Sequence, residues 1–490
     1  MEQTKNLQLP GNPRYQPKDL IKVWGYDYLY QSYIAVELAV METLAEAGVI
    51  PADEFRLMTP AVTASLAEIT TSEVDEIERK VTKHDIRALV HAMQQRMPEP
   101  LRRWVHMPLT SYDVIDTARA MQFVSAHNVV ISKLMQLLYI FAARCRDHAD
   151  TLMIGRTHGQ HALPITAGFW LATILSRLIA NTISLDAAAG NLVGKISGAV
   201  GAYNAQVGLG MYCVGDGPTF EERVLGKLGL APALVSTQIA PPEPLADYLF
   251  ATMKLVAALG QFGEDCRQLM RTEIGEICEP FAATQVGSST MAHKRNPINF
   301  EGLVAAWISS QAEYGKVVGT LISEHQRDLT GSAVSRDYPV IVINLVRQMD
   351  TLLRADKAGK SFLERINIDK EACLKNFKMS AHLVMAEPLY IALQQYGYPG
   401  DAHELVNHKV VPEATRTGMS LIDTMRCLAR ESYDASIPGG RADWQLFADA
   451  LMRLPDSVQE KLGRPEEYIG RAPEIARETA ARAIALIASL

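Results

Sequence analysis

The chain has 490 residues, of which 48% are hydrophobic and 21% are charged, a balance typical of a globular protein with two or three domains. Its net charge of -7 argues against non-specific binding to nucleic acid, because affinity for a phosphate backbone requires clustered positive charge. The N-terminus is polar, and the longest apolar stretches, at 129–143 and 163–175, are too short or interrupted to span a bilayer. Six cysteines without a C-x-x-C pair favour reduced thiols. We expect a soluble cytoplasmic protein that binds neither nucleic acid nor membrane.

Helical periodicity dominates the chain. Apolar residues recur at steps of three and four over residues 113–150, 165–195, 245–280 and 298–325, which predicts four unusually long helices. Alternating strand patterns are scarce, so the expected fold class is all-α. We expect an N-terminal helical domain over residues 1–112, a central long-helix bundle domain over 113–365 and a C-terminal helical domain over 366–490. Apolar residues on more than one helix face predict a homo-oligomer.

Two polar clusters precede or open predicted helices in the first third of the chain. The first is Lys83-His84-Asp85, and the second is Thr110-Ser111-Tyr112-Asp113. Thr-Ser-x-Asp before a helix is first of all a capping signal. Taken alone, each cluster therefore has a purely structural interpretation.

A third cluster spans residues 155–161 and contains two histidines. His158 and His161 have the i,i+3 spacing of a possible metal pair. No H-E-x-x-H motif or neighbouring carboxylate completes a site, so the pattern argues against a metal. An isolated histidine is more often structural than catalytic.

The segment 282–302 interrupts the helical pattern. It is rich in Gly, Ser, Thr and Asn, and Asn296-Pro297 is a favourable start for the next helix. Lys294 and Arg295 lie beside that helix N-terminus, where free backbone N–H groups and the helix dipole favour a carboxylate or phosphate. The alternative is a surface loop followed by an ordinary cap.

A fourth cluster lies at residues 324–336. Arg327, Ser332 and Arg336 can jointly bind a phosphate through guanidinium forks and a hydroxyl. Considered separately, each is equally well a solvated charge or a residue at a helix end.

Taken together and in this order, the clusters resemble the fumarase/aspartase superfamily. Residues 287–297, GSSTMAHKRNP, are similar to its G-S-S-x-M-x-x-K-x-N signature. Within that superfamily the chain most resembles the adenylosuccinate lyase family. The matching features are Arg14-Tyr15, Lys83-His84-Asp85, Leu109-Thr110-Ser111-x-Asp113, Thr157-His158-Gly159-Gln160, Ser236-Thr237-Gln238, the Arg327/Ser332/Arg336 spacing and Tyr468-Ile469-Gly470-Arg471-Ala472.

The resemblance implies a fold, an assembly and a reaction. The fold is the three-domain, all-α fumarase/aspartase-like fold with a central long-helix bundle, assembled as a homotetramer whose active sites each draw on three subunits. The reaction is elimination of fumarate from adenylosuccinate, giving AMP, and from the succinylated aminoimidazole carboxamide ribotide of purine biosynthesis. It requires no metal and no organic cofactor.

The resemblance also implies roles for individual residues. Ser288 is the expected base, and Lys294 with the helix start at Asn296 is expected to stabilise its alkoxide and hold the succinyl carboxylates. His158 is the expected general acid, with Glu301 as its carboxylate partner. The remaining residues are expected to bind substrate: Lys83, His84 and Asp85 in support; Thr110, Ser111 and Gln238 at the succinyl and base portions; Arg14, Tyr15, Arg327, Ser332 and Arg336 at the phosphate and ribose.

Two departures bear on substrate identity. Ala292 stands where the family usually has proline, and residues 331–336 differ in detail from familiar lyase sequences. The nearest rival is carboxymuconate cycloisomerase, which needs no phosphate-binding residues; argininosuccinate lyase and fumarase fit less well. A catalytically silent structural homologue, as in lens crystallins, is the non-enzyme alternative, but it would be expected to have lost the serine, histidine or lysine.

Overall fold

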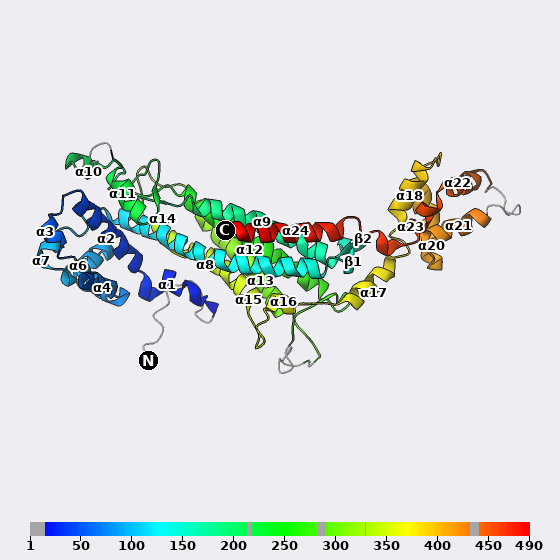
Figure 1. The fold of residues 1–490 in the computed structure, drawn as a ribbon, viewed down its shortest axis with the longest axis horizontal. Coiled ribbons are helices and arrows are strands. Elements are labelled where there is room, and N and C mark those ends of the chain that lie inside the picture. Colours follow the sequence, from blue (N-terminus) through cyan, green and yellow to red (C-terminus); the bar gives the residue numbers. More distant parts are fainter. Residues whose placement is uncertain (1–14, 213–216, 282–290, 292, 329, 432–440) are drawn as a thin grey trace. The chain divides into compact units, whose positions relative to one another are not determined.

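The computed structural model describes residues 15–212, 217–281, 291, 293–328, 330–431 and 441–490, and helices dominate these residues. The four expected long helices are present as α8 (Ser111–Asp147), α9 (Ala167–Ala189), α12 (Glu243–Leu269) and α13 (Ile298–Gly319) (Figure 1). The prediction of an all-α fold is therefore confirmed. The predicted helix at 245–280 extends too far, because the chain turns after Leu269 and passes through Gly275 with a φ of +65°.

The contacts divide the chain into two compact units that are interleaved in sequence. Unit 1 comprises Met1–Leu137, Arg177–Gly263 and Glu301–Arg354, and unit 2 comprises Leu138–Ser176, Glu264–Phe300 and Ala355–Leu490. The long helices therefore contribute residues to both units.

The other elements of unit 1 are mostly short helices. They are α1 (Ile21–Trp24), α2 (Gln31–Glu46), α3 (Ala52–Phe55), α4 (Pro60–Ala67), α5 (Thr71–Ile77), α6 (Asp85–Arg96), α7 (Glu99–Arg102), β3 (Val193–Gly194), α10 (Asn204–Gly208), α11 (Phe220–Lys227), β4 (Ala231–Pro232), α14 (Thr330–Val334) and α15 (Pro339–Leu353). The two strands, β3 and β4, pair in parallel.

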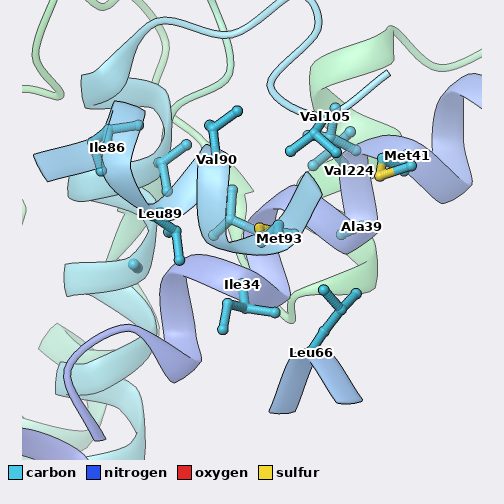
Figure 2. Packing of buried hydrophobic residues seen from close by; sticks show 14 of the residues in the cluster. Ile34, Ala39, Met41, Leu66, Ile86, Leu89, Val90, Met93, Val105 and Val224 are labelled. Atoms are coloured by element: carbon cyan, nitrogen blue, oxygen red, sulfur yellow. The ribbon is translucent and has the colours of Figure 1, made fainter. Parts of the chain in front are cut away.

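The core of unit 1 near α6 is a continuous apolar cluster. The buried side of α6 carries Ile86, Leu89, Val90 and Met93, which face Ile34 and other apolar residues of α2 (Figure 2). Spacings of three and four residues place these side chains on one helix face. This packing fixes α6, whose N-terminus carries the Lys83-His84-Asp85 cluster.

A buried amide links the long helices within unit 1. Gln348 of α15 donates hydrogen bonds to the carbonyls of Val256 in α12 (3.1 Å) and Leu303 in α13 (2.8 Å). Asn344, one turn earlier, donates to the hydroxyl of Ser310 (3.0 Å). Buried polar groups need such partners, so these bonds fix how the three helices pack.

Unit 2 combines a hairpin, a short sheet and the C-terminal helices. Its elements besides the long helices are β1 (Leu152–Thr157), β2 (Gln160–Thr166), β5 (Ile277–Cys278), α16 (Phe362–Arg365), β6 (Asn367–Ile368), α17 (Lys370–Ser380), α18 (Ala386–Gln395), α19 (Ala402–Leu405), α20 (Val411–Thr417), α21 (Leu421–Glu431), α22 (Arg441–Arg453), α23 (Asp456–Leu462) and α24 (Ala472–Ser489). Both sheets are antiparallel pairs. The hairpin was not anticipated from the sequence.

Two of the long helices also reach the length and hydropathy of a membrane span. α8 and α9 each contain an 18-residue window with a mean hydropathy of 1.3. In these windows, 44% and 50% of the residues are buried inside the chain, as in the core helices of globular proteins. By their length, α8 and α9 could each cross a membrane, contrary to the sequence-based argument. The burial of these helices within the chain argues against a membrane span.

The described cysteines are free thiols. Cys145, Cys266 and Cys373 are buried, and Cys278 and Cys427 are half-buried. Burial raises the pKa of Cys145 and of Cys373 to about 12. A thiol with such a pKa is inert as a nucleophile at neutral pH.

Candidate functional site

In unit 1, Thr110 and Ser111 lie at the N-terminus of α8, and Asp113 fixes their backbone. The Asp113 carboxylate accepts a hydrogen bond from the Thr110 backbone N–H (2.9 Å), and the Asp113 N–H donates to the Thr110 carbonyl (3.0 Å). This reciprocal pattern is a helix cap, as the Thr-Ser-x-Asp sequence predicts. The cap leaves the half-buried side chains of Thr110 and Ser111 available for other contacts.

The same carboxylate organises the loop that follows β3. Asp113 accepts bonds from the Lys195 ammonium (2.5 Å) and from the backbone N–H groups of Ser197 and Gly198 (both 3.1 Å). The side chains of Lys195 and Asp113 are 0% and 1% exposed. A buried ion pair is tolerated only when its remaining hydrogen-bonding capacity is satisfied, and here backbone groups provide that. The loop is thereby held against the start of α8.

Gln238 is placed by a close approach of two backbones. A Cβ atom on Gly201, whose φ is +75°, would lie 2.0 Å from the carbonyl oxygen of Ser236, so only glycine fits there. Further on, the Ala240 backbone N–H donates to the Asp116 carboxylate of α8 (2.9 Å). The segment that carries Gln238 is thus fastened at both ends within unit 1.

Arg327 and Ser332 are brought together on Tyr112, the second residue of α8. The Arg327 guanidinium lies over the Tyr112 ring, 3.5 Å from its centroid, and donates to the Ser332 hydroxyl at 2.5 Å. The Tyr112 hydroxyl also hydrogen-bonds Ser332. Stacking and hydrogen bonds together fix the plane of the guanidinium, which suits it to bind an oxyanion. Arg336 is exposed and lies in the turn after α14.

A cavity of about 110 Å³ opens beside this cluster. One part of its lining is polar, and the rest is apolar and rich in proline. Burial raises the pKa of Asp116 at this cavity, whereas the positive charge of Arg119 opposes that effect. The lining includes Tyr112, Asp116, Arg119, Arg327, Ser332, Leu192, Ile239, Pro241 and Pro242. Such a mixture suits a ligand with an apolar body and an anionic group.

The Lys83-His84-Asp85 cluster forms the N-terminus of α6 in unit 1. His84 is the N-cap, and its imidazole Nδ1 lies 3.2 Å from the Asp85 carboxylate. Lys83 has a left-handed backbone with a φ of 53°, and its ammonium donates to the Arg79 carbonyl. All three side chains are exposed or nearly so.

In unit 2, His158 occupies the tip of the β1–β2 hairpin. His158 and Gly159 have φ values of 54° and 76°, as a two-residue type I′ turn requires. His158 is exposed, whereas His161 on β2 contacts the Ser380 hydroxyl of α17 at 2.9 Å. The two histidines therefore have different surroundings: His158 is exposed at the turn, whereas His161 contacts helix α17.

The described end of the 287–297 segment leads into α13. Lys294 is exposed, and its backbone N–H donates to the Met291 carbonyl (3.0 Å). Asn296 is half-buried, and Glu301 is exposed in the first turn of α13. Ser288 and Arg14 lie outside the described residues.

Tyr15 is exposed in unit 1, with the Arg347 guanidinium 5.6 Å from its ring centroid.

The site residues predicted from the sequence lie in both units. Two of these residues, Arg327 and Ser332, lie together. Three others lie on segments that are attached to the same stretch of α8: Thr110, Ser111 and Gln238.

Sequence reasoning missed three residues that organise these clusters: Tyr112, Lys195 and Glu276. Tyr112 was read only as the variable position of Thr-Ser-x-Asp. Lys195 and Glu276 are buried charges; the apolar neighbours of Lys195 are a sequence signal that could have marked it, whereas the sequence around Glu276 contains other charged residues and offers no such signal.

Known proteins resemble this chain over most of its length. A family described as lyase matches residues 17–310, which is more than half of the chain. Adenylosuccinate lyase from Pyrococcus abyssi is 32% identical over 472 residues, covering 95% of this chain and 96% of that protein. Adenylosuccinate lyase from Pyrococcus horikoshii is 33% identical over 477 residues, covering 96% of each.

Solved structures share the fold. Fumarate lyase from Mesorhizobium sp. BNC1 superposes with a TM-score of 0.77 at 19% identity, over 96% of this chain and 100% of that one. The 3-carboxy-cis,cis-muconate lactonizing enzyme from Pseudomonas putida gives 0.76 at 23% identity, over 96% and 98%. At these identities the likeness concerns the fold alone. The full-length similarity to the curated relatives shows that the chain belongs to the adenylosuccinate lyase family, within the fumarase/aspartase superfamily.

Proposed function

We propose that this chain is a carbon–nitrogen lyase that cleaves adenylosuccinate to AMP and fumarate, and that it performs the same cleavage on the succinylated aminoimidazole carboxamide ribotide of purine biosynthesis. The observation that carries the proposal is the Tyr112–Arg327–Ser332 cluster beside the cavity, in a chain similar to adenylosuccinate lyases over nearly its whole length. A stacked, hydrogen-bonded guanidinium is suited to a phosphate, and both substrates carry one.

The difficult step is removal of a proton from the carbon beside a carboxylate. It creates a dianionic aci-carboxylate, so it requires a base, nearby positive charge and an acid for the leaving nitrogen. We assign the base to Ser288. An ordinary seryl hydroxyl is too weakly acidic for this role, and Lys294 with the N-terminus of α13 would supply the positive field that stabilises its alkoxide. Lys294 and Asn296 would also hold the succinyl carboxylates.

We assign the proton donor to His158. This histidine lies on a tight hairpin turn and is exposed in the single chain, which suits it to reach a substrate held by other elements. Glu301 is the proposed carboxylate partner of this histidine, and His84 is proposed to assist in binding.

The remaining assigned residues bind the substrate. Thr110, Ser111 and Gln238 would contact the succinyl and base portions, and Lys83 and Asp85 would support His84. Arg14, Tyr15, Arg327, Ser332 and Arg336 would hold the phosphate and ribose. The Gly-Ser-Ser segment is proposed to close over the bound substrate and exclude water.

The proposal extends to assembly and organisation. It takes the active protein to be a cytoplasmic homotetramer with each active site built from three subunits, and the chain to consist of domains at 1–112, 113–365 and 366–490. Exposed apolar residues on the long helices, such as Phe250 of α12 and Ile308 of α13, support a further interface. Neither a metal nor an organic cofactor enters the proposed reaction.

Carboxymuconate cycloisomerase activity is the second candidate, since the fold resembles a lactonizing enzyme. That reaction gives no role to the guanidinium and hydroxyl on Tyr112, which is why adenylosuccinate is preferred. The test is to mix purified protein with each substrate and follow fumarate release or carboxymuconate consumption. Fumarate release from adenylosuccinate is the expected result. Turnover of carboxymuconate without turnover of adenylosuccinate would overturn the proposal.

A further inference from the structure

A bulge in the β1–β2 hairpin aims one arginine out of the strand. The pairing register shifts between Ile154 and Arg156, and a Cβ on Gly155 would lie 2.8 Å from the Leu163 carbonyl oxygen. Glycine is therefore required at the bulge, and a bulge redirects the next side chain. Arg156 lies on β1, two residues before His158 in the turn.

Arg156 forms a bidentate ion pair with a fully buried glutamate. Its two terminal nitrogens lie 2.9 Å and 2.8 Å from the Glu276 carboxylate oxygens, and the two side chains are 15% and 0% exposed. Asn376 of α17 donates to the same carboxylate (2.9 Å) and to the Ile274 carbonyl (2.8 Å). Each carboxylate oxygen has a partner, so the pair is held in one geometry.

Glu276 is itself fixed by its backbone. Its N–H donates to the Leu269 carbonyl (3.0 Å), and its carbonyl accepts from the Asp369 N–H (2.9 Å). It immediately precedes β5, which pairs with β6. An isolated two-stranded hairpin is marginal by itself. Ile154 in the core of unit 2 and the His161–Ser380 contact also hold this hairpin, and the Arg156–Glu276 pair adds a charged anchor two residues before His158.

The other end of β5 holds a different element. Glu279 is buried, and one of its carboxylate oxygens accepts from the backbone N–H groups of Asn299 (2.9 Å) and Phe300 (3.0 Å) in the first turn of α13. The other oxygen accepts from the Asn299 amide (2.6 Å). A carboxylate at a helix N-terminus satisfies free N–H groups and interacts favourably with the helix dipole.

We propose that Glu276 and Glu279 form a two-ended clamp: Glu276 positions the His158 hairpin through Arg156, and Glu279 positions the start of α13. This inference rests on the proposed function for its kinetic consequences. His158 acts as the proton donor, whereas Lys294 and Asn296, which precede α13, act on the substrate carboxylates, and Lys294 with the start of α13 also stabilises the Ser288 base. The Glu276 end of the clamp therefore affects kcat, whereas the Glu279 end affects both KM and kcat. Glu276, Arg156 and Glu279 are positioning residues and do not touch the substrate.

The first test compares Glu276→Gln with Glu279→Gln in the full-length protein. Glu276→Gln places an amide against the Arg156 guanidinium and should loosen the hairpin. We expect kcat to fall by about 10- to 100-fold with KM within about threefold, because misplacing a catalytic group affects the chemical step. Glu279→Gln should raise KM by about three- to tenfold and also lower kcat, because the start of α13 serves both the substrate carboxylates and the base. Glu276→Asp, which retains the charge, should recover part of the lost kcat.

A matched control is Glu73→Gln. Glu73 forms a bidentate pair with Arg96 elsewhere, in unit 1 and remote in sequence from the hairpin. Its removal takes away the same kind of ion pair, so the thermal midpoint should fall while kcat stays within about twofold of wild type. A fall in kcat equal to that of Glu276→Gln would mean that general destabilisation explains the result, and the clamp would be refuted.

Hydrogen exchange separates the clamp from the proposed function. In Glu276→Gln, amides of residues 152–166 should exchange faster than in wild type, and those of 298–302 should not; Glu279→Gln should show the reverse. This pattern tests the clamp even if wild type releases no fumarate, a result that would overturn only the proposed function. Unchanged exchange at 152–166 in folded Glu276→Gln would overturn the clamp.

Discussion

The two units stabilise their site residues by different means. In unit 1, two carboxylates of α8 hold neighbouring loops by accepting backbone hydrogen bonds. The Asp113 carboxylate accepts from the N–H groups of residues 197 and 198, and the Asp116 carboxylate accepts from that of Ala240. In unit 2, side-chain contacts hold the hairpin, among them the ion pair of Arg156 with Glu276 and the His161–Ser380 contact. Carboxylates that accept hydrogen bonds from backbone N–H groups fix the shape of a binding surface, whereas a side-chain ion pair helps to fix the position of one turn. The proposed binding residues lie mainly in unit 1, and the proposed base and acid lie in the sequence segments of unit 2.

The largest effect should come from removing the proposed base. Ser288→Ala should lower kcat by about 10³-fold or more, because loss of a general base removes the proton-transfer pathway while binding contacts persist. Steady-state kinetics on adenylosuccinate, with equilibrium binding measured by calorimetry, check this. A variant with near-wild-type kcat would show that Ser288 is not the base and that the division between binding and chemistry is misassigned.

Breaking the carboxylate anchor of unit 1 should mainly affect stability. Asp113→Asn leaves the buried Lys195 ammonium without a counter-charge, which is expected to cost about 3–5 kcal/mol of unfolding free energy. Urea unfolding measures the loss. The control is Glu413→Gln, which breaks an exposed pair with Arg416 and should leave stability almost unchanged, because solvent screens such a pair. Equal effects of the two changes would contradict the anchoring role.

Unit 2 should contribute a pH-dependent stability through His148. Burial, together with the charges of Arg144 and Lys370, lowers the pKa of His148 to about 4. Since the unfolded state binds a proton near pH 6.5 and the folded state does not, this stability is present above pH 6.5 and is lost as the pH falls towards 4. The loss amounts to roughly 2–3 kcal/mol.

The variant His148→Asn should therefore lose less stability than wild type between these pH values. Urea midpoints measured from pH 7 to pH 4 provide the comparison. Parallel curves for the two proteins would show that His148 is not the titrating group and would remove this difference between the units.

The smallest effect concerns the phosphate end of the substrate. Arg327→Ala should raise KM for adenylosuccinate by about 10- to 30-fold with kcat little changed, through loss of a charge-assisted contact. Tyr112→Phe keeps the ring under Arg327 and removes only the hydroxyl on Ser332, so a change of about threefold or less is expected. An unaltered KM for Arg327→Ala would place the phosphate elsewhere.

Periodicity sufficed to predict the helical fold, because α8 and α12 repeat their apolar pattern over many turns. The β1–β2 hairpin escaped prediction, since its strands are short and the bulge at Gly155 breaks their alternation. Thr110 and Ser111 could be placed at a helix start from capping chemistry alone. The roles of Ser288 and His158 came from family resemblance, because neither spacing nor composition distinguishes a catalytic serine from a loop serine.

The buried pairs were beyond the reach of sequence patterns. Lys195 and Asp113 are 82 residues apart, and Arg156 and Glu276 are 120 residues apart. A periodic pattern reports which face of an element is buried, but it carries no information on which distant charge meets which. The stacking of Arg327 on Tyr112 escaped prediction for the same reason.

The cap on α13 has a consequence for how this protein can diverge. The carboxylate of Glu279 comes from before the intervening segment, so the start of the helix does not depend on what that segment contains. Residues there, including the unusual Ala292, can be exchanged without unwinding the helix behind them. The segment proposed to carry the base can therefore change its sequence, and with it the specificity, while the scaffold behind it stays intact.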